Sequence, residues 1–164
     1  MTQENSEWHE RREVKIADYG EKLIREYLED ENYICYKPVT DGAHLFDLLI
    51  YRKDTGVMAA EVKTKPRRNK YPDTGFNYRN YECYKQFTEE HNIKMFVYFI
   101  DELEGKIYGN YLDELDKPRI SSGKKYPLDS NSIRYYPLDA MKIIRLLTDD
   151  EKNELRKLQE INKN

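Results

Sequence analysis

The chain has 164 residues, and we expect a single domain over residues 1–164 that is large enough to bury its own core. Its formal net charge of −3 excludes a protein that coats nucleic acid by bulk positive charge, although a local basic patch remains compatible with DNA binding. The two cysteines lack the spacing of a metal site, so we expect buried, reduced thiols. The sequence shows no apolar leader and no apolar run of bilayer length, which predicts a cytoplasmic protein without membrane contact.

The first predicted element is a helix over residues 7–31, which is rich in Glu, Lys, Arg and Leu and contains no proline. Val14, Ile24 and Leu28 recur at helical spacing and predict the face that packs on the core. Glu21 falls at the margin of this face, directly after Gly20, whose missing side chain would let another backbone approach. Glu21 is therefore a candidate site residue; the alternative is a glutamate that only borders the solvent.

A short strand over residues 33–36 is expected to end near Pro38, and a turn over residues 40–42 leads into a hairpin over residues 45–65. The arms of this hairpin read LFDLLIY and VMAAEV, which favour a pleated, buried surface. Residues 53–56, KDTG, supply the turn, because Gly56 adopts a positive φ without steric cost.

The hairpin carries three ionisable residues that apolar strands rarely hold, namely Asp47, Glu61 and Lys63. Side chains two apart on a strand point the same way, so Glu61 and Lys63 share a face, and pairing of the two arms brings Asp47 near Glu61. Two converging carboxylates repel each other unless one is protonated or a cation neutralises them. The alternative is a surface salt-bridge cluster in a highly charged chain. His44, just before the hairpin, fits a loop residue better than a catalytic base.

A basic run made of Lys65, Arg67, Arg68 and Lys70 follows the hairpin directly, and Pro66 inside it predicts that the chain leaves the sheet as a loop. Its position beside the acidic residues favours contact with DNA phosphates over a merely solvated connection. The segment over residues 71–76, YPDTGF, is predicted to continue the loop.

The rest of the chain predicts alternating elements of both kinds. These are a helix over 77–91 capped by Asn92, a buried strand over 94–100, a strand over 106–112, a helical turn over 113–116, an exposed loop over 119–132, an edge strand over 133–136, an apolar-faced helix over 138–147, and a final helix that starts at the capping box formed by Thr148 and Glu151.

This order of elements, with GEKLIREYLEDENYICYK followed by FDLLIYRKDTGVMAAEVK, resembles the PD-(D/E)XK nuclease superfamily and is similar to archaeal Holliday-junction resolvases. The resemblance covers about residues 13–101, whereas the extension over 102–164 has no family feature. Phe46 stands where many members have a proline before the first acid, a departure that the family tolerates. The resemblance implies an α/β fold of the restriction-endonuclease type, a mixed central sheet flanked by helices in the order α-β-β-β-α-β with added strands and C-terminal helices.

The same resemblance implies site roles. Asp47, Glu61 and the main-chain carbonyl of Val62 correspond to ligands of Mg²⁺, for which Mn²⁺ can substitute, and Glu21 corresponds to the helical acid that assists them. Lys63 matches the lysine that orients or activates the attacking water. Gln86 is a weaker match to a helical residue near DNA.

These roles imply a Mg²⁺-dependent deoxyribonuclease, with endonuclease favoured over exonuclease, DNA as partner and a homodimer as one assembly to test. Two other functions stay open: a nuclease-fold DNA-binding or regulatory module with little or no cleavage, and an α/β domain whose acidic hairpin is accidental.

Overall fold

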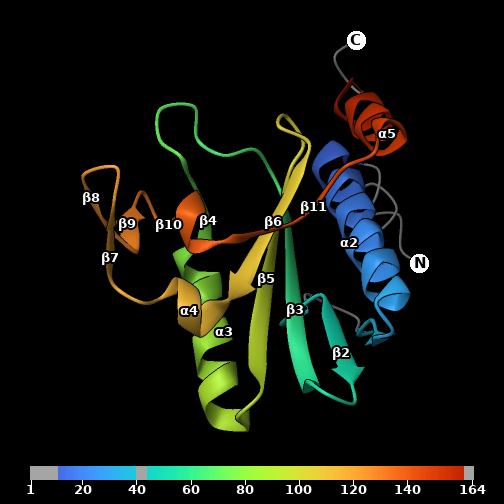
Figure 1. The fold of residues 1–164 in the computed structure, drawn as a ribbon, viewed down its shortest axis with the longest axis horizontal. Coiled ribbons are helices and arrows are strands. Elements are labelled where there is room, and N and C mark those ends of the chain that lie inside the picture. Colours follow the sequence, from blue (N-terminus) through green and yellow to red (C-terminus); the bar gives the residue numbers. More distant parts are fainter. Residues whose placement is uncertain (1–10, 40–43, 161–164) are drawn as a thin grey trace.

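The computed structural model describes residues 11–39 and 44–160 and is built around a six-stranded mixed sheet (Figure 1). The sheet has the order β1-β2-β3-β5-β6-β11, in which β3 and β5 are parallel and every other neighbouring pair is antiparallel. The strands are β1 (Ile34–Tyr36), β2 (Leu48–Arg52), β3 (Gly56–Thr64), β5 (Lys94–Asp101), β6 (Lys106–Tyr111) and β11 (Lys142–Leu146). The mixed sheet between helices confirms the predicted α/β fold class.

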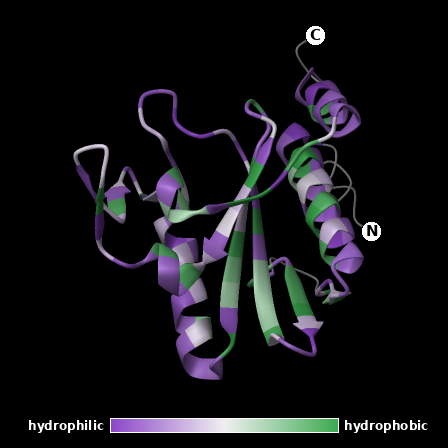
Figure 2. Ribbon diagram, viewed as in Figure 1, coloured by the Kyte–Doolittle hydropathy of each residue, from purple (hydrophilic) through white to green (hydrophobic). Residues whose placement is uncertain are grey.

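Helices cover both faces of this sheet. On one face lie α2 (Arg12–Asp30) and α5 (Asp149–Glu160), whose residues Ile24 and Leu155 share a buried cluster with the strands. On the other face lie α3 (Tyr78–His91) and α4 (Leu112–Leu115), which contribute Phe87 and Leu115 to a second buried cluster. Hydrophobic residues follow the strands and the inner side of α2, whereas the segment over residues 65–72 is mostly hydrophilic (Figure 2).

The central hairpin forms, but its first strand begins at Leu48, so that Asp47 lies just before the strand in which it was predicted. Leu48 pairs with Ala60 across β2 and β3, and Gly56 has a φ of +74° where the chain enters β3. Ala60 and Val62 pack toward α2, whereas Ala59 belongs to the cluster on the α3 side. Alternation along β3 therefore turns Glu61 toward α3, away from the apolar face that α2 covers.

Gly20 lies where α2 packs against the end of β3. A Cβ atom at this position would lie 1.8 Å from Oγ1 of Thr64, a distance at which one of the two elements would have to move. The glycine thus leaves room for the Thr64 side chain between the helix that carries Glu21 and the end of β3, whereas the sequence predicted the approach of a backbone.

A second, three-stranded sheet lies beside α3 and replaces two segments that were predicted to be loops. It has the order β4-β10-β9, formed by β4 (Asp73–Asn77), β10 (Ile133–Pro137) and β9 (Leu128–Ser130). A separate hairpin joins β7 (Arg119–Ser121) to β8 (Lys124–Tyr126). The loop predictions for 71–76 and 119–132 are therefore wrong in part, and the strand predicted at 133–136 exists but is the middle strand and not an edge. Its partner β4 is more than fifty residues away in the chain, which local patterns cannot reveal.

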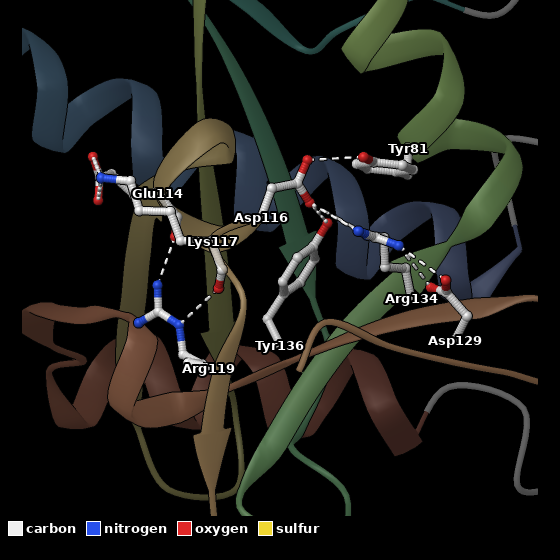
Figure 3. Close-up of polar contacts among 8 residues, drawn as sticks. All are labelled: Tyr81, Glu114, Asp116, Lys117, Arg119, Asp129, Arg134 and Tyr136. Carbon is white, nitrogen blue, oxygen red and sulfur yellow. Dashed lines mark hydrogen bonds and ion pairs between the residues drawn. The ribbon is translucent and has the colours of Figure 1, made fainter. Parts of the chain in front are cut away.

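A polar cluster fastens the small sheet to α3 and to the α4 segment (Figure 3). Asp116 accepts hydrogen bonds from Tyr81 (2.8 Å), Tyr136 (3.4 Å) and Arg134 (3.3 Å). The Arg134 guanidinium also reaches Asp129 at 2.9 Å and lies 4.2 Å from the centre of the Tyr81 ring. One arginine on β10 thereby joins three separate parts of the chain.

The helix predicted over 138–147 is wrong. Leu138–Ala140 form a single 3-10 turn, and the chain then continues as β11, which pairs with β6. Met141, Ile144 and Leu147 do recur at a helix-like spacing of three, but pairing with the otherwise open edge of β6 satisfies the backbone groups of this segment. The capping box that follows is confirmed, because the Thr148 N–H donates to Glu151 (2.8 Å) and the Glu151 N–H donates to Oγ1 of Thr148 (3.2 Å).

Both cysteines are free thiols, but the expectation that both are buried holds only in part. Cys35 on β1 is half-buried, and burial raises the pKa of its thiol. Cys83 on α3 is exposed. None of the helices that the structure describes is long and apolar enough to cross a bilayer.

Candidate active site

The hairpin brings Asp47 and the Glu61 segment together through main-chain hydrogen bonds. Asp47 lies immediately before β2, and its N–H donates to the Ala60 carbonyl at 3.2 Å. In return, the Val62 N–H donates to Oδ2 of Asp47 at 2.7 Å. The side chain of Asp47 is thus held against the strand segment that carries Glu61, and the main chain of Val62 lies beside the acid.

The pKa of Asp47 is strongly affected by its surroundings. Burial raises its pKa to about 7, and the negative charges of Glu61 and Glu21 act in the same direction. The Val62 N–H and the Lys63 ammonium lower it, but not enough to offset those effects. Glu61 of β3 and Glu21 of α2 therefore each lie near enough to Asp47 to act on its charge.

Glu61 is buried, with 3% of its surface exposed, and two donors hold it. The Lys63 ammonium forms a short ion pair with Oε1, and the Tyr84 hydroxyl donates to the same oxygen at 2.6 Å. The Lys63 side chain is 24% exposed, so it faces both Glu61 and the solvent from which a substrate would arrive. The predicted pairing of Glu61 and Lys63 on one face of β3 is thus present.

Tyr84 is a site residue that the sequence did not identify. It lies on the buried face of α3 between Tyr81 and Phe87. Burial and the neighbouring Glu61 carboxylate raise the pKa of its hydroxyl, so the group stays a hydrogen-bond donor at neutral pH. The available signal was the helical spacing of the three aromatics, which indicated burial but not a carboxylate partner.

Glu21 reaches the site from α2 and is held by Lys37. The Lys37 ammonium lies 2.6 Å from Oε2 of Glu21, whose side chain is 17% exposed. Burial acts to lower the pKa of Lys37, but Glu21, Asp18 and Asp47 together raise it above its usual value. Lys37 was not predicted, and its place directly after β1 gives no local signal of this contact.

In the part of the chain that the structure describes, no three His, Cys, Asp or Glu side chains converge into a group that could hold a metal ion. Lys63 and Lys37 instead contact Glu61 and Glu21. The chemistry of the donors nevertheless fits a hard divalent cation, because Glu61 raises the pKa of Asp47 and a cation shared by the two carboxylates would offset their repulsion. Asp47 and Glu61, with the main chain of Val62 beside them, are the residues that would hold it.

Some side chains of the basic run after β3 form ion pairs within the protein, whereas others face the solvent. Arg67 pairs with Glu104 at 2.6 Å, and Nε of Arg68 donates to Oδ1 of Asp73 at 2.6 Å. Lys65 is half-buried, and burial together with Lys63 lowers its pKa. Lys70 is exposed. The two arginines therefore hold the loop in place, and Lys70 is the member of the run that faces outward most fully.

The two remaining candidates lie apart from the acids. Gln86 is exposed on α3 and donates to Glu90 at 2.7 Å. Two residues along a helix correspond to a rotation of about 200°, so Gln86 faces away from the side on which Tyr84 meets Glu61. His44 is exposed before β2. The structure thus brings together Glu21, Asp47, Glu61 and Lys63, and leaves Gln86 outside the group.

If Asp47 and Glu61 hold a divalent cation, we predict that Tyr84→Phe weakens its binding about tenfold to a hundredfold, in line with the loss of other hydrogen bonds to ligand carboxylates. A Mg²⁺ titration should show this weaker binding, because Glu61 would lose one of its two donors. Tyr81→Phe is the matched control, since it removes a hydroxyl from the same helix that donates to Asp116 instead. An unchanged Mg²⁺ dependence in Tyr84→Phe would show that this hydroxyl has no part in positioning Glu61.

The fold resembles those of solved structures, although the sequence does not resemble known proteins. No family model matches the sequence, and no curated protein matches it either. A solved structure of Hjc, a Holliday junction resolvase from the archaeal hyperthermophile Archaeoglobus fulgidus, superimposes with a TM-score of 0.52 over 74% of this chain and 88% of that one, at 10% sequence identity. At this identity the likeness concerns the fold. The chain therefore has a restriction-endonuclease-like fold of the kind seen in Hjc.

Proposed function

We propose that the protein is a metal-dependent DNA nuclease that hydrolyses phosphodiester bonds. The observation that carries the proposal is the convergence of Asp47 and Glu61 at the hairpin, with Lys63 beside them and Glu21 delivered from α2. A structure without a catalytic task has no evident need for three neighbouring acids, since their repulsion destabilises the folded state. The likeness to the fold of a resolvase supports the same conclusion.

Each residue has a part that its surroundings allow. A Mg²⁺ or Mn²⁺ ion bound by Asp47, Glu61 and the Val62 carbonyl would lower the pKa of a bound water and offset charge on the phosphoryl group. Lys63 is partly exposed and would orient the attacking water. Tyr84 fixes the Glu61 carboxylate, and Glu21 adds negative charge beside Asp47.

A substrate screen tests the proposal. Purified protein is incubated with single-stranded, duplex, flapped and four-way DNA, with Mg²⁺, with Mn²⁺ or with a chelator. We expect cleavage of at least one of these substrates with metal and none with chelator. Metal-dependent products with defined internal ends would identify an endonuclease.

A second function rests on a specific observation: Lys63 and Lys37 already neutralise Glu61 and Glu21 within the protein. A chain whose acids are satisfied by its own lysines suits a DNA-binding or regulatory module of nuclease fold. Binding of one of the four DNAs without cleavage under either metal would favour this function over the first.

A further inference from the structure

The loop between β3 and β4 lies beside β8 and β10, and together these segments form a surface rich in lysine and tyrosine next to the small sheet. The loop between β3 and β4 supplies Lys70 and Tyr71, the start of β8 supplies Lys124, and β10 supplies Tyr135. The Lys124 ammonium lies 3.3 Å from the centre of the Tyr71 ring, and the Lys70 ammonium lies 5.6 Å from it. We call Lys70, Tyr71, Lys124 and Tyr135 the lysine–tyrosine surface.

Arg68 lies within this surface and connects its two rings. Its guanidinium is 3.7 Å from the centre of the Tyr135 ring and 4.8 Å from that of Tyr71. Its charge is matched by Asp73, which is fully buried and also accepts a hydrogen bond from Tyr126 of β8 at 2.6 Å. This buried contact fixes the hairpin of β7 and β8 against the loop, so the lysines on either side are held together by the fold.

The charge of the surface is not balanced locally. Within residues 11–39 and 44–160, no ion pair is formed by Lys70 or Lys124. The cations around Tyr71 lower the pKa of its hydroxyl, Lys124 most of all. A chain with a net charge of −3 thus gathers uncompensated positive charge in one place. Rings beneath the ammonium groups hold these groups in position without neutralising them.

Packed aromatic rings connect the small sheet beside this surface to the candidate active site. Phe76 of β4 lies 5.5 Å from the ring of Tyr84, which holds Glu61, and 5.7 Å from the ring of Tyr136 on β10. Lys70 is seven positions after Lys63, so their Cα atoms are at most about 25 Å apart. This is less than one turn of duplex DNA, about 34 Å, so one DNA molecule is long enough to meet both.

We propose that the lysine–tyrosine surface binds the phosphate backbone of DNA next to the cleavage site, with Lys70 and Lys124 as its principal contacts. This inference rests on the proposed nuclease function, and it adds Lys124, which lies outside the predicted core of residues 13–101, to the Lys70 contact expected from the basic run. Lysines on aromatic rings suit a contact with backbone charge and not with base edges. Binding by this surface is therefore independent of DNA sequence.

The test compares two double variants that lose the same charge. Lys70→Gln with Lys124→Gln removes the proposed contacts, and Lys142→Gln with Lys157→Gln removes two exposed lysines on β11 and α5. Affinity for a 30-base-pair duplex and for its single strand is measured by fluorescence anisotropy in chelator over a range of salt concentrations. We expect the first variant to bind about tenfold more weakly than wild type and to flatten the slope of log K against log salt by about 1.8 for duplex, two contacts at about 0.9 each. The second should retain the wild-type slope.

The possible results distinguish failure of the proposed DNA-binding surface from failure of the proposed nuclease function. If wild type cleaves DNA but the two double variants have equal affinities and slopes, the surface is overturned and the nuclease function stands. If only the first variant loses affinity and slope while no DNA is cleaved under either metal, the surface is supported and the nuclease function fails. A wild-type protein that binds neither duplex nor single strand overturns the surface, and the substrate screen then decides the nuclease function separately.

Discussion

Glu61→Gln is expected to lower the cleavage rate by about a thousandfold or more, equivalent to about 4 kcal/mol of lost transition-state stabilisation. The change removes a negative charge where the proposed metal would be held, but keeps an oxygen that can accept hydrogen bonds from Lys63 and Tyr84. The folded structure should therefore persist, and the melting temperature should stay close to that of wild type. Single-turnover cleavage of the best substrate from the screen gives the rate.

Glu102→Gln is the matched control for this variant. Glu102 is a partly buried glutamate in the turn after β5 that accepts a hydrogen bond from Gln159 at 3.2 Å. The same chemical change there should leave the cleavage rate within about twofold of wild type, since this carboxylate is not part of the site. Full activity in Glu61→Gln would remove Glu61 from the proposed metal site.

Arg68→Ala is expected to lower the free energy of unfolding by about 3 kcal/mol, because it leaves the Asp73 carboxylate buried without its cation. Asp73 has no exposed surface, and after the change only the Tyr126 hydroxyl remains as a side-chain partner. The stacking of the guanidinium on Tyr135 is lost as well. Urea denaturation followed by circular dichroism measures the difference.

The neighbouring arginine provides the control. Arg67 pairs with Glu104 at the surface, where the two side chains are 39% and 28% exposed, so Arg67→Ala should cost no more than about 1 kcal/mol. Equal losses in the two variants would contradict the view that Arg68 is a structural cation. The expected difference also means that substituting all the basic residues of this loop together would confuse unfolding with weaker DNA binding.

The parts of the fold that sequence reasoning predicted are those with strong local patterns. The apolar stripe of α2, the alternation in β3, the continuous apolar run of β5 and the capping box at Thr148 each depend on residues within a few positions of one another. The same holds for Asp47, Glu61 and Lys63, because a tight turn at Gly56 makes their pairing a local matter.

The errors fall where a distant partner decides the conformation. Residues 73–77 contain Asp and Gly, which favour a turn, yet they form a strand because β10 pairs with them. The segment after Met141 has helix-like spacing, yet it extends along β6. Tyr84 and Lys37 were missed as site residues for a related reason, since their carboxylate partners lie 23 and 16 positions away.

The exposed thiol of Cys83 gives this protein a native position for a spectroscopic label. Cys83 directly precedes Tyr84 on α3, whereas the other thiol, Cys35, is half-buried and has a raised pKa, which disfavours its reactive thiolate form. A maleimide dye or spin label should therefore react first at Cys83 without any engineered residue. Such a probe would sit on the helix that holds Glu61, and would report on that helix as DNA and metal are added.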